Sequence, residues 1–413
     1  MSIMLATEFI NKVNGFWISS IEEDQDRAFW ERSAYHIGNI ETYKLTGNKE
    51  YLEFTQKWCE VNKWKSHPYE GHSDSWTWGY GEEESKAVLF ADWHACFQVY
   101  LEIYNMGNKE HPEYIEYAKR IIDYQISKDD DSFWWWADGL YMGMPVMVKL
   151  YNITGDESYL EKLHQYFIYS VELMYDGEKG IPISESHYKS TAYFGGPYGG
   201  KKSVRSRFSD PNQYSHLFFR DASYVYPSKP LPGKLSEVKN FWARANGWVF
   251  ASLARLLKEL SSSWQHYDFY MQIYKDMAHS IVHSQKFDQR GNGFWTQSML
   301  AHSYSTNDQN PEGYETSGTA FFLYGLLVGV NEGILVKSST ENSISSSWNY
   351  LSKVAMHDSG KIGYVQPVGG EAGKAAEYGN TQDFGVGASL LAATEMVKYQ
   401  AQLKGEKNAK WTK

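Results

Sequence analysis

The sequence predicts an all-α protein folded as an (α/α)6 barrel, in which six inner helices form a ring and six outer helices surround it. Three observations lead to this fold class. A motif that ends one helix and begins the next recurs along the chain, apolar residues repeat at helical spacing, and six helix openings fit six helical hairpins. No comparable series of the alternating apolar and polar residues typical of strands accompanies them.

The recurring motif is clear in two segments and weaker in a third: KLTGNKEYLEF at 44–54, NITGDESYLEKL at 152–163, and NMGNKEHPEYIEYA at 105–118. Each copy has a glycine placed to end a helix and, shortly after it, a polar residue placed to begin the next. The glycines, Gly47, Gly107 and Gly155, are 60 and 48 residues apart, a length that one helical hairpin fills.

Six helix openings, each a polar or small residue followed by an apolar face, mark the inner helices near Ser33, Asp92, Asp138, Arg244, Glu315 and Asp383. An apolar stripe at helical spacing follows the third opening, formed by Leu140, Met144, Met147, Val148 and Tyr151. The interval after that opening, 106 residues, is the longest and predicts a loop insertion after the third hairpin, at about residues 177–239. We expect one catalytic domain, residues 1–413. An open solenoid has the same local pattern, so closure of the ring is inferred from the count of six.

The predicted insertion is rich in glycine, serine, tyrosine and basic residues. A loop of this length inside a compact domain is usually functional or disordered, and its aromatic content favours a function. We expect the insertion to lie near the barrel mouth, which is the end where the inner helices begin, and to bring His216 and Arg220 there. A second glycine-rich segment, 360–380, joins the last two hairpins as a turn or a lid.

Composition narrows the function. The formal net charge of −10 and the lack of a lysine or arginine run argue against a nucleic-acid partner. Aromatic residues make up 16% of the chain, with 16 tryptophans and 32 tyrosines, and such side chains suit stacking against sugar rings. The first residues show neither a secretory signal nor a membrane span, so we expect a cytoplasmic or periplasmic protein without a membrane partner, either a monomer or a homodimer.

Metal and cofactor sites are not expected. The two cysteines, Cys59 and Cys96, are too few for a disulfide framework or a cysteine-rich zinc site. The sequence lacks an HExxH zinc motif, a GxSxG elbow, a P-loop and a dinucleotide-type glycine motif. We therefore predict chemistry carried by side chains alone.

Asp138 is the first candidate catalytic residue, because it follows three tryptophans in FWWWADGLYMGMP, residues 133–145. A carboxylate in the first turn of a helix is normally stabilised by the helix dipole, which lowers its pKa. The neighbouring aromatic rings would instead desolvate the carboxylate and raise its pKa, as a general acid requires. The sequence leaves both alternatives open, a helix cap or a catalyst. Trp136, Tyr141 and Met142 are the expected substrate contacts around it, with Trp136 as the tryptophan that faces the pocket.

Asp92 holds the corresponding place one hairpin earlier, in FADWHACFQVYLEIY, with Phe90 and Trp93 beside it. Neighbouring inner helices would bring Asp92 and Asp138 within reach of one small ligand. Two carboxylates in different surroundings are the usual equipment for acid–base work on sugars. The alternative is a pair of helix caps in a repeat protein. His94, two residues further on, is also expected at the mouth.

The segment FWARANGWVF, residues 241–250, opens the next inner helix with four candidate binding residues: Trp242, Arg244, Asn246 and Trp248. Arg244 could hold a carboxylate through two hydrogen bonds while an indole stacks on a sugar ring. An interhelical salt bridge with cation–π packing explains the same residues equally well.

With these residues in place, the chain resembles the unsaturated glucuronyl and rhamnogalacturonyl hydrolases, glycoside hydrolase families 88 and 105. The matching segments are WADGLYMGMP, FADWHACFQVYLEIY, FWARANGW and YETSGTAFFLYGL. They lie in family order over most of the chain, and DGLYMGMP is more similar to family 105. Ala243 stands where relatives often have glycine.

The resemblance implies an (α/α)6 barrel that removes a C4=C5 unsaturated uronic acid from the non-reducing end of oligosaccharides made by polysaccharide lyases. In the family's mechanism an aspartate protonates C4, water adds at C5, and the resulting hemiketal opens with loss of the glycosidic bond. Transferred by motif, Asp138 is the proton donor and the base for water, and Asp92 orients the sugar. Trp242, Arg244 and Asn246 would contact the substrate, and His216 or Arg220 would meet the uronate carboxylate.

The basic insertion raises the hypothesis that the leaving sugar is rhamnose, sulfated as in ulvan rather than plain as in pectin. Two alternatives remain: a sugar 2-epimerase of the same barrel type, which would rely on a pair of histidines, and a non-catalytic carbohydrate-binding barrel. The DGLYMGMP motif argues against the epimerase.

Overall fold

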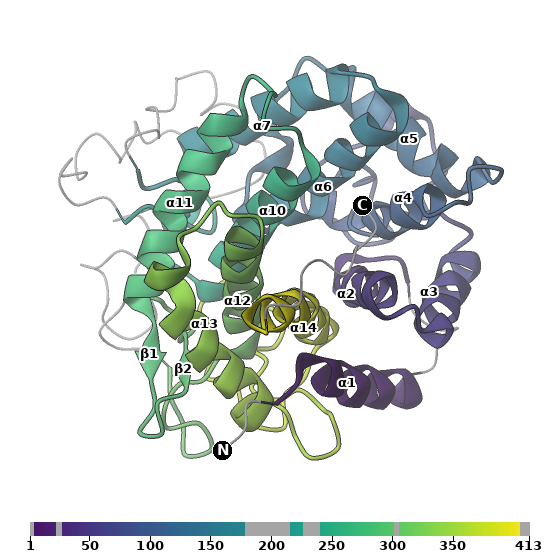
Figure 1. Cartoon of the computed structure of the whole chain (residues 1–413). Helices are drawn as coiled ribbons and strands as arrows, with labels where there is room; N and C mark the ends of the chain where they lie inside the picture. Colours follow the sequence, from purple (N-terminus) through teal and green to yellow (C-terminus); the bar gives the residue numbers. More distant parts are fainter. Residues whose placement is uncertain (1–3, 22–26, 178–214, 226–239, 301–304, 405–413) are drawn as a thin grey trace.

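The structure, a computed structural model, describes five stretches of the chain: residues 4–21, 27–177, 215–225, 240–300 and 305–404. Helices dominate these stretches (Figure 1), and the only named strands in them are β1 (Lys286–Phe287) and β2 (Gly293–Phe294), which pair antiparallel. Most of the predicted insertion at 177–239 lies outside the described residues. Its described part, residues 215–225, holds His216 and Arg220.

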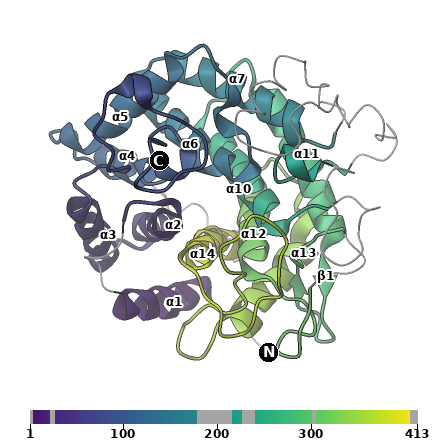
Figure 2. The ribbon, with the colours of Figure 1, turned by 180° about the vertical axis from the view of Figure 1, so that it is seen from behind.

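Six inner helices form the ring: α2 (Trp30–Thr46), α4 (Phe97–Asn105), α6 (Ala137–Thr154), α10 (Ala243–Glu259), α12 (Thr316–Asn331) and α14 (Asp383–Leu403). Each packs against the next in chain order, and α14 packs against α2, so the ring is closed. Figures 1 and 2 show α14 beside α2 from opposite sides. Closure confirms the predicted (α/α)6 barrel and excludes the open solenoid.

The outer layer consists of α3 (Lys49–Val61), α5 (Glu113–Ile126), α7 (Ser158–Met174), α11 (Tyr267–Ser284), α13 (Lys337–Tyr350) and α1 (Ala6–Ser20). The first five pack on the inner helix that precedes them in the chain. The sixth outer position is different, because α1 from the N-terminal side packs on α14. The last inner helix is therefore paired with the first helix of the chain.

Local signals explain where the helices begin and end. Gly47 and Gly155 take the left-handed conformation at φ 69° and 72°, and each ends its inner helix by donating a backbone hydrogen bond to the residue four positions back. Gly107 also has positive φ, just beyond α4. Glu315 caps α12, since its carboxylate accepts hydrogen bonds from the backbone of Ser317 and Gly318 at 3.0 and 2.7 Å.

Glycine makes the contact that closes the ring. A Cβ added to Gly38 of α2 would lie 2.4 Å from the carbonyl oxygen of Gly387 in α14. The backbones of the two helices therefore touch, which no side chain would allow. This contact lets the first and last inner helices pack as closely as their neighbours do.

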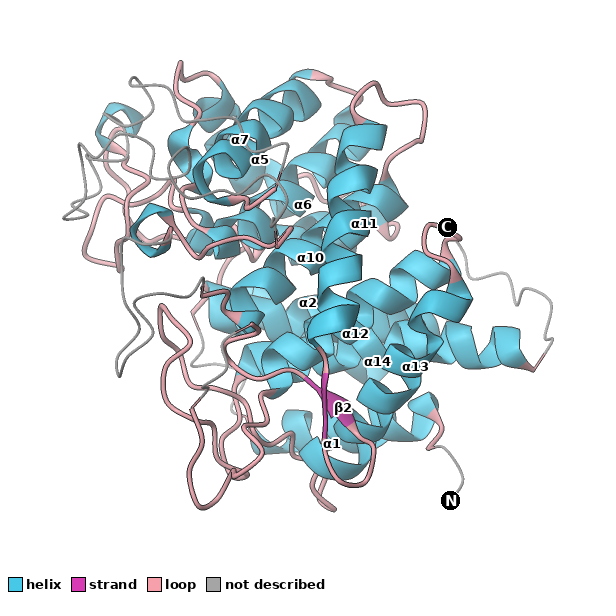
Figure 3. Ribbon diagram, turned by 90° about the vertical axis from the view of Figure 1, so that its left-hand side faces the viewer, coloured by secondary structure: helices cyan, strands magenta, loops and turns pink. Residues whose placement is uncertain are grey.

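The two ends of the barrel differ in their chemistry. At the C-terminal ends of the inner helices, Lys149 of α6 bonds Glu102 of α4 and Glu259 of α10. Lys258 of α10 bonds Glu395 of α14 at 2.8 Å. The opposite end is the mouth, where the six inner helices begin and where the long connections gather, on the left of Figure 3.

Candidate active site

Asp138 lies in the first turn of α6, at the mouth. The described part of the insertion pairs with the residues just before Asp138: Trp136 and Asp221 form an isolated antiparallel bridge, and Ala137 N donates to Arg220 O at 2.8 Å. This short pairing brings Arg220 beside Asp138, although 82 residues separate them in the chain (220 − 138).

The Asp138 carboxyl lies in a desolvating environment. The Oδ2 atom is buried and has no hydrogen-bond partner among the described residues. Desolvation raises the pKa of Asp138 above its ordinary value, against the opposing positive charges of Arg220 and Arg244. The hydrogen bond from its own backbone N–H also lowers the pKa, but this effect is smaller than that of burial. Of the two alternatives that the sequence left open, the direction of this shift fits a general acid and not an ionised cap.

Asp92 interacts with the same region from the segment just before α4, the preceding inner helix. It lies in the short helix η2 (Ala91–Trp93) before α4 and is 8% exposed. Burial raises its pKa well above the ordinary value, and the negative charges of Asp138 and Glu31 raise it further, while Arg220 lowers it. Asp92 and Asp138 therefore interact electrostatically and share one cationic neighbour.

Arg220 is the cation of this cluster. Its Nη1 donates to Asp221 Oδ2, and its guanidinium carbon lies 5.8 Å from the centre of the Trp135 ring. The Nε of Arg220 is buried without a hydrogen-bond partner among the described residues. A guanidinium with an unused donor beside two carboxyls is suited to bind an acidic ligand.

The three tryptophans before Asp138 have different surroundings. Trp134 is buried against Tyr166 of α7, with ring centres 5.4 Å apart. Trp136 is 2% exposed and stacks on Phe90 at 4.7 Å. Trp135 is partly exposed and lies beneath Arg220. The expectation that Trp136 faces the pocket is therefore not met: Trp135 keeps the accessible ring, because Trp136 packs beneath it.

Three other predicted contacts lie inside the barrel. Tyr141 and Trp248 are fully buried with ring centres 4.6 Å apart, and Met142 is also buried. Burial raises the pKa of Tyr141 to about 12. These side chains pack in the core and have almost no exposed surface.

Trp242 and Arg244 hold the second glycine-rich segment in place. Trp242 Nε1 donates to Gln366 Oε1 at 2.8 Å, and Arg244 Nη1 donates to the carbonyl of Gln366 at 2.7 Å. Arg244 Nη2 donates to the carbonyl of Pro367 at 3.1 Å. The guanidinium lies 4.4 Å from the Trp242 ring centre, and burial lowers the pKa of Arg244 to about 10. Arg244 therefore packs on an aromatic ring, as the cation–π alternative expected. Its hydrogen-bond acceptors, however, are backbone carbonyls.

Asn246 is buried, and its amide bonds both the N–H and the carbonyl of Phe218 at 2.8 and 2.9 Å. It ties the described part of the insertion to α10.

His94 is also buried, with its Nε2 3.0 Å from the carbonyl of Val88. Burial lowers the pKa of His94 to about 4, so this ring stays neutral. His216 is partly exposed, and its Nδ1 lies 3.3 Å from the Tyr175 hydroxyl.

Glu31 is a mouth residue that sequence reasoning missed. It lies in the first turn of α2, which begins at Trp30 and not near Ser33 as expected. Burial raises the pKa of Glu31 to about 7, and its charge acts on Asp92. The same signal that identified Asp92, a carboxylate at a helix opening beside aromatic residues, stands in FWERS and could have found it.

The described residues contain no group of three or more histidines, cysteines, aspartates or glutamates arranged to hold a metal ion. Within the same stretches, no helix is long and apolar enough to cross a membrane.

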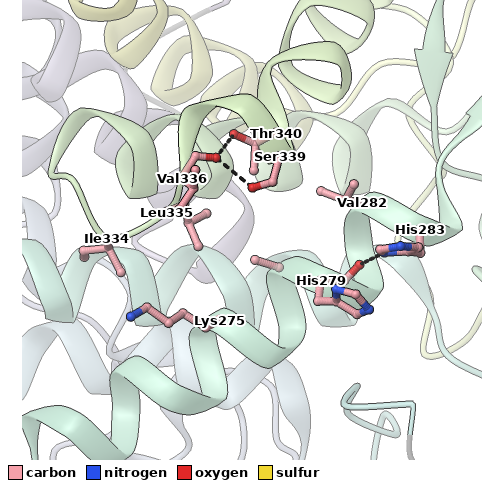
Figure 4. Close-up of a pocket in the computed structure, with 10 residues that line it drawn as sticks. Lys275, His279, Val282, His283, Ile334, Leu335, Val336, Ser339 and Thr340 are labelled. Atoms are coloured by element: carbon pink, nitrogen blue, oxygen red, sulfur yellow. Dashed lines mark hydrogen bonds between the residues drawn. The ribbon is translucent and has the colours of Figure 1, made fainter.

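A separate surface pocket of about 380 Å³ lies between α11 and the start of α13 (Figure 4). Its lining combines apolar and histidine side chains: Lys275, Ala278, His279, Val282, His283, Ile334, Leu335, Val336, Ser339 and Thr340. None of the predicted site residues lines it. The candidate site is therefore the mouth cluster of Asp138, Asp92 and Arg220.

An (α/α)6 barrel whose mouth holds two desolvated carboxyls, an arginine and a partly exposed indole has the groups that carbohydrate-active enzymes use for acid–base chemistry. The model of Glycosyl Hydrolase Family 88 matches residues 4–207 and 201–400 of the chain. The chain belongs to this family and is a glycoside hydrolase, which confirms the predicted resemblance to families 88 and 105.

Individual relatives agree over nearly the whole chain. A solved structure of a family 88 glycosyl hydrolase from Bacteroides vulgatus is 34% identical, with a TM-score of 0.79, covering 95% of this chain and 98% of that one. A solved structure named as a polysaccharide lyase is 39% identical, with a TM-score of 0.78 and coverage of 96% and 97%. The unsaturated 3S-rhamnoglycuronyl hydrolase of Formosa agariphila is 26% identical over 390 residues, 90% of this chain and 85% of that protein.

Proposed function

We propose that this protein removes the C4=C5 unsaturated uronic acid from the non-reducing end of lyase-generated acidic oligosaccharides. The observation that carries the proposal is the Asp138 carboxyl, which has a raised pKa and a buried, unpartnered oxygen beside Arg220. A raised pKa favours the protonated carboxyl that proton donation to an enol ether requires.

In the proposed reaction Asp138 gives its proton to C4, and C5 takes a hydroxyl from water. The proton left by that water passes to the Asp138 carboxylate, so the carboxyl ends the step as it began. The C5 hemiketal then opens by cleavage of its bond to the ring oxygen, leaving a ketone at C5. The hemiacetal at C1 releases the leaving sugar as an alcohol, and the net change is the addition of one water.

The neighbouring residues take supporting roles. Asp92 binds and orients the unsaturated sugar from the adjacent inner helix. Arg220 binds the uronate carboxylate through its unused Nε donor, with Trp135 behind it. His216, on the same segment, is the second candidate for that carboxylate. Trp242, Arg244 and Asn246 act by holding segment 366–369 and the described part of the insertion around the substrate.

The leaving sugar is proposed to be rhamnose, sulfated as in ulvan. The support is the name of the Formosa agariphila relative, an unsaturated 3S-rhamnoglycuronyl hydrolase, together with the basic character of the insertion in the sequence. The sugar 2-epimerase and the non-catalytic barrel gain no support from the family match.

A polysaccharide lyase is the second candidate, because a 39% identical structure carries that name. A lyase needs an ionised base to remove the proton at C5, whereas burial raises the pKa of both Asp92 and Asp138 and so disfavours their ionised forms. The raised pKa values therefore favour the hydrolase.

The ultraviolet absorbance of the C4=C5 bond distinguishes the two candidates, because a hydrolase lowers it and a lyase raises it. The purified protein should abolish the absorbance of lyase digests of pectin, arabinogalactan or ulvan without added metal or nucleotide, and mass analysis of the products names the leaving sugar. A rise in absorbance on the intact polysaccharides would establish a lyase. Unchanged absorbance in every digest would contradict the hydrolase.

A further inference from the structure

Tyr80 is an exposed aromatic residue at the edge of the mouth. It lies in the loop between α3 and η2 and is 69% exposed. Its ring meets Phe90 edge-on, with ring centres 5.7 Å apart and an interplanar angle of 70°. Phe90 is the residue before η2 and is two positions from Asp92. Tyr80 therefore stands directly outside the carboxyl cluster.

Phe90 connects Tyr80 to the indoles beside Asp138. Phe90 is buried and stacks on Trp136 at 4.7 Å and on Trp135 at 6.4 Å. We call these four rings, Tyr80, Phe90, Trp135 and Trp136, the aromatic row. Only its two ends, Tyr80 and Trp135, keep accessible surface, because the other two rings are buried.

Tyr80 is held in place despite its exposure. Its hydroxyl donates to Glu82 Oε1 at 2.7 Å, and Arg27 Nη1 donates to Glu82 Oε2 at 2.8 Å. The Arg27 guanidinium in turn lies 4.4 Å from the centre of the Phe29 ring. Single exposed tyrosines are common and need no function. The Tyr80 ring, held by these hydrogen bonds, loses little conformational freedom when a ligand stacks on it.

The charges that act on Tyr80 fit its position at the edge of the mouth. The hydrogen bond to Glu82 is the largest cause that raises the pKa of Tyr80 to about 12, and the charges of Asp92 and Glu31 add to it. The phenol therefore remains neutral at any physiological pH. A neutral aromatic face suits the apolar C–H face of a sugar ring beside an otherwise acidic mouth.

We propose that Tyr80 is a sugar-stacking residue that binds the leaving-group side of the oligosaccharide, with Trp135 as the inner stacking ring. This inference rests on the proposed function. The unsaturated uronic acid must reach Asp138, which follows Trp135 and Trp136 of the aromatic row in the chain, so we place the rest of the oligosaccharide outward along the row. Tyr80 at the outer end then contacts the second or a later sugar and does not touch the reacting one.

The test compares an unsaturated disaccharide with an unsaturated tetrasaccharide from the same lyase digest, using the fall in ultraviolet absorbance. Tyr80→Ala should raise KM for the tetrasaccharide by about threefold to tenfold, the effect of one lost stacking contact, with kcat little changed. The change in KM for the disaccharide should be clearly smaller. Tyr80→Phe, which keeps the ring and loses the bond to Glu82, should recover most of the wild-type preference.

A matched control is Tyr378→Ala. Tyr378 is also an exposed tyrosine on a loop, but its ring stacks on His357 and is not part of the aromatic row. This variant should show the wild-type ratio of the two KM values. Equal effects of Tyr80→Ala on both substrates, or no effect on either, would overturn the inference and leave the proposed hydrolase intact. A wild-type protein inactive on both substrates would contradict the proposed function itself, and this inference with it.

Discussion

The negative charge of Asp138 raises the pKa of Asp92, which opens the adjacent inner helix. Arg220 is the cation that lowers the pKa of both carboxyls. Such a pair titrates as a unit, so the pH profile of the enzyme reports both residues together.

Replacing the proposed proton donor should remove turnover and keep the fold. Asp138→Asn should lower kcat by roughly a hundredfold to ten-thousandfold, the usual contribution of general acid–base catalysis. Its thermal unfolding midpoint should not fall, because the variant removes a desolvated carboxyl whose Oδ2 has no partner among the described residues. Activity assays and a thermal melt check both points. Retained turnover would make Asp138 a helix cap.

Glu31 should raise the pKa of the pair formed by Asp92 and Asp138. Its negative charge raises the pKa of Asp92, so Glu31→Gln should lower that pKa. Activity that needs a proton on the pair is lost as pH rises through its pKa, so the alkaline limb of kcat/KM should move to lower pH. An unchanged limb in the variant would show that Glu31 does not act on the pair.

Arg220 should act in the opposite direction. Its positive charge lowers the pKa of Asp92 and Asp138, so Arg220→Gln should move the alkaline limb to higher pH. Loss of a charge-assisted hydrogen bond to the uronate should also raise KM by about tenfold to a hundredfold.

Arg220→Lys separates these two effects. Lysine keeps the charge and hence the pH profile, but it lacks the planar pair of donors and should leave KM raised. A lysine variant with wild-type KM would argue against binding of the uronate by the guanidinium.

The glycine contact between α2 and α14 should be needed for stability. Gly38→Ala places a methyl group 2.4 Å from the Gly387 carbonyl oxygen, so the helices must separate, at a cost of about 1–3 kcal/mol in the free energy of unfolding. Urea titration measures this cost. Gly15→Ala in α1 is the control: it meets nothing within 4 Å and should stabilise by about 0.5–1 kcal/mol. Equal stability of the two variants would contradict a tight contact between α2 and α14.

The ion pairs at the far end of the barrel should make stability depend on acid pH. Glu395 is 1% exposed and accepts hydrogen bonds from Lys258 and Lys398, both at 2.8 Å. Although burial opposes it, the charge of Lys258 is the largest cause that lowers the pKa of Glu395, to about 2. Glu395→Gln should cost about 3–5 kcal/mol near neutral pH.

Because the pKa of Glu395 is lowered, the stabilisation by its ion pairs should weaken as pH falls. The stabilisation is complete above the unfolded pKa of about 4.3 and is lost as pH falls toward 2, so wild type and variant should converge there. Glu53→Gln, at an exposed position of α3, should change stability by less than about 0.5 kcal/mol at any pH. A constant difference between wild type and Glu395→Gln from pH 7 to 2 would contradict the ion-pair origin.

Helix openings were predictable from the sequence because capping is local. Asp138, Arg244, Glu315 and Asp383 each lie within one residue of the start of an inner helix. Around Asp92 the match is looser, since a short 3-10 helix precedes α4 there. The closing pair was not predictable in the same way, because α1 is far from α14 in the chain and only packing brings them together.

The candidate site was predictable by residue type and less so by side-chain position. The sequence analysis named Asp138, Asp92 and Arg220 as candidates, and the structure brings them together, but it also assigned substrate contacts to Tyr141, Met142 and Trp248, which the barrel packs in its core. Helical periodicity tells which residues share a face, whereas the rotation of that face toward the mouth depends on neighbouring helices.

The hairpins, their order, the family motifs and the acidic residues at the helix openings could be predicted from local sequence, because each signal lies within one or two helical turns. The tertiary structure decided closure of the ring, the placing of Arg220 beside Asp138, and the exposure of Trp135 in place of Trp136. It also decided the direction of the pKa shift at Asp138. Desolvation sums the atoms around a group, and at Asp138 those atoms come from segments that only folding brings together.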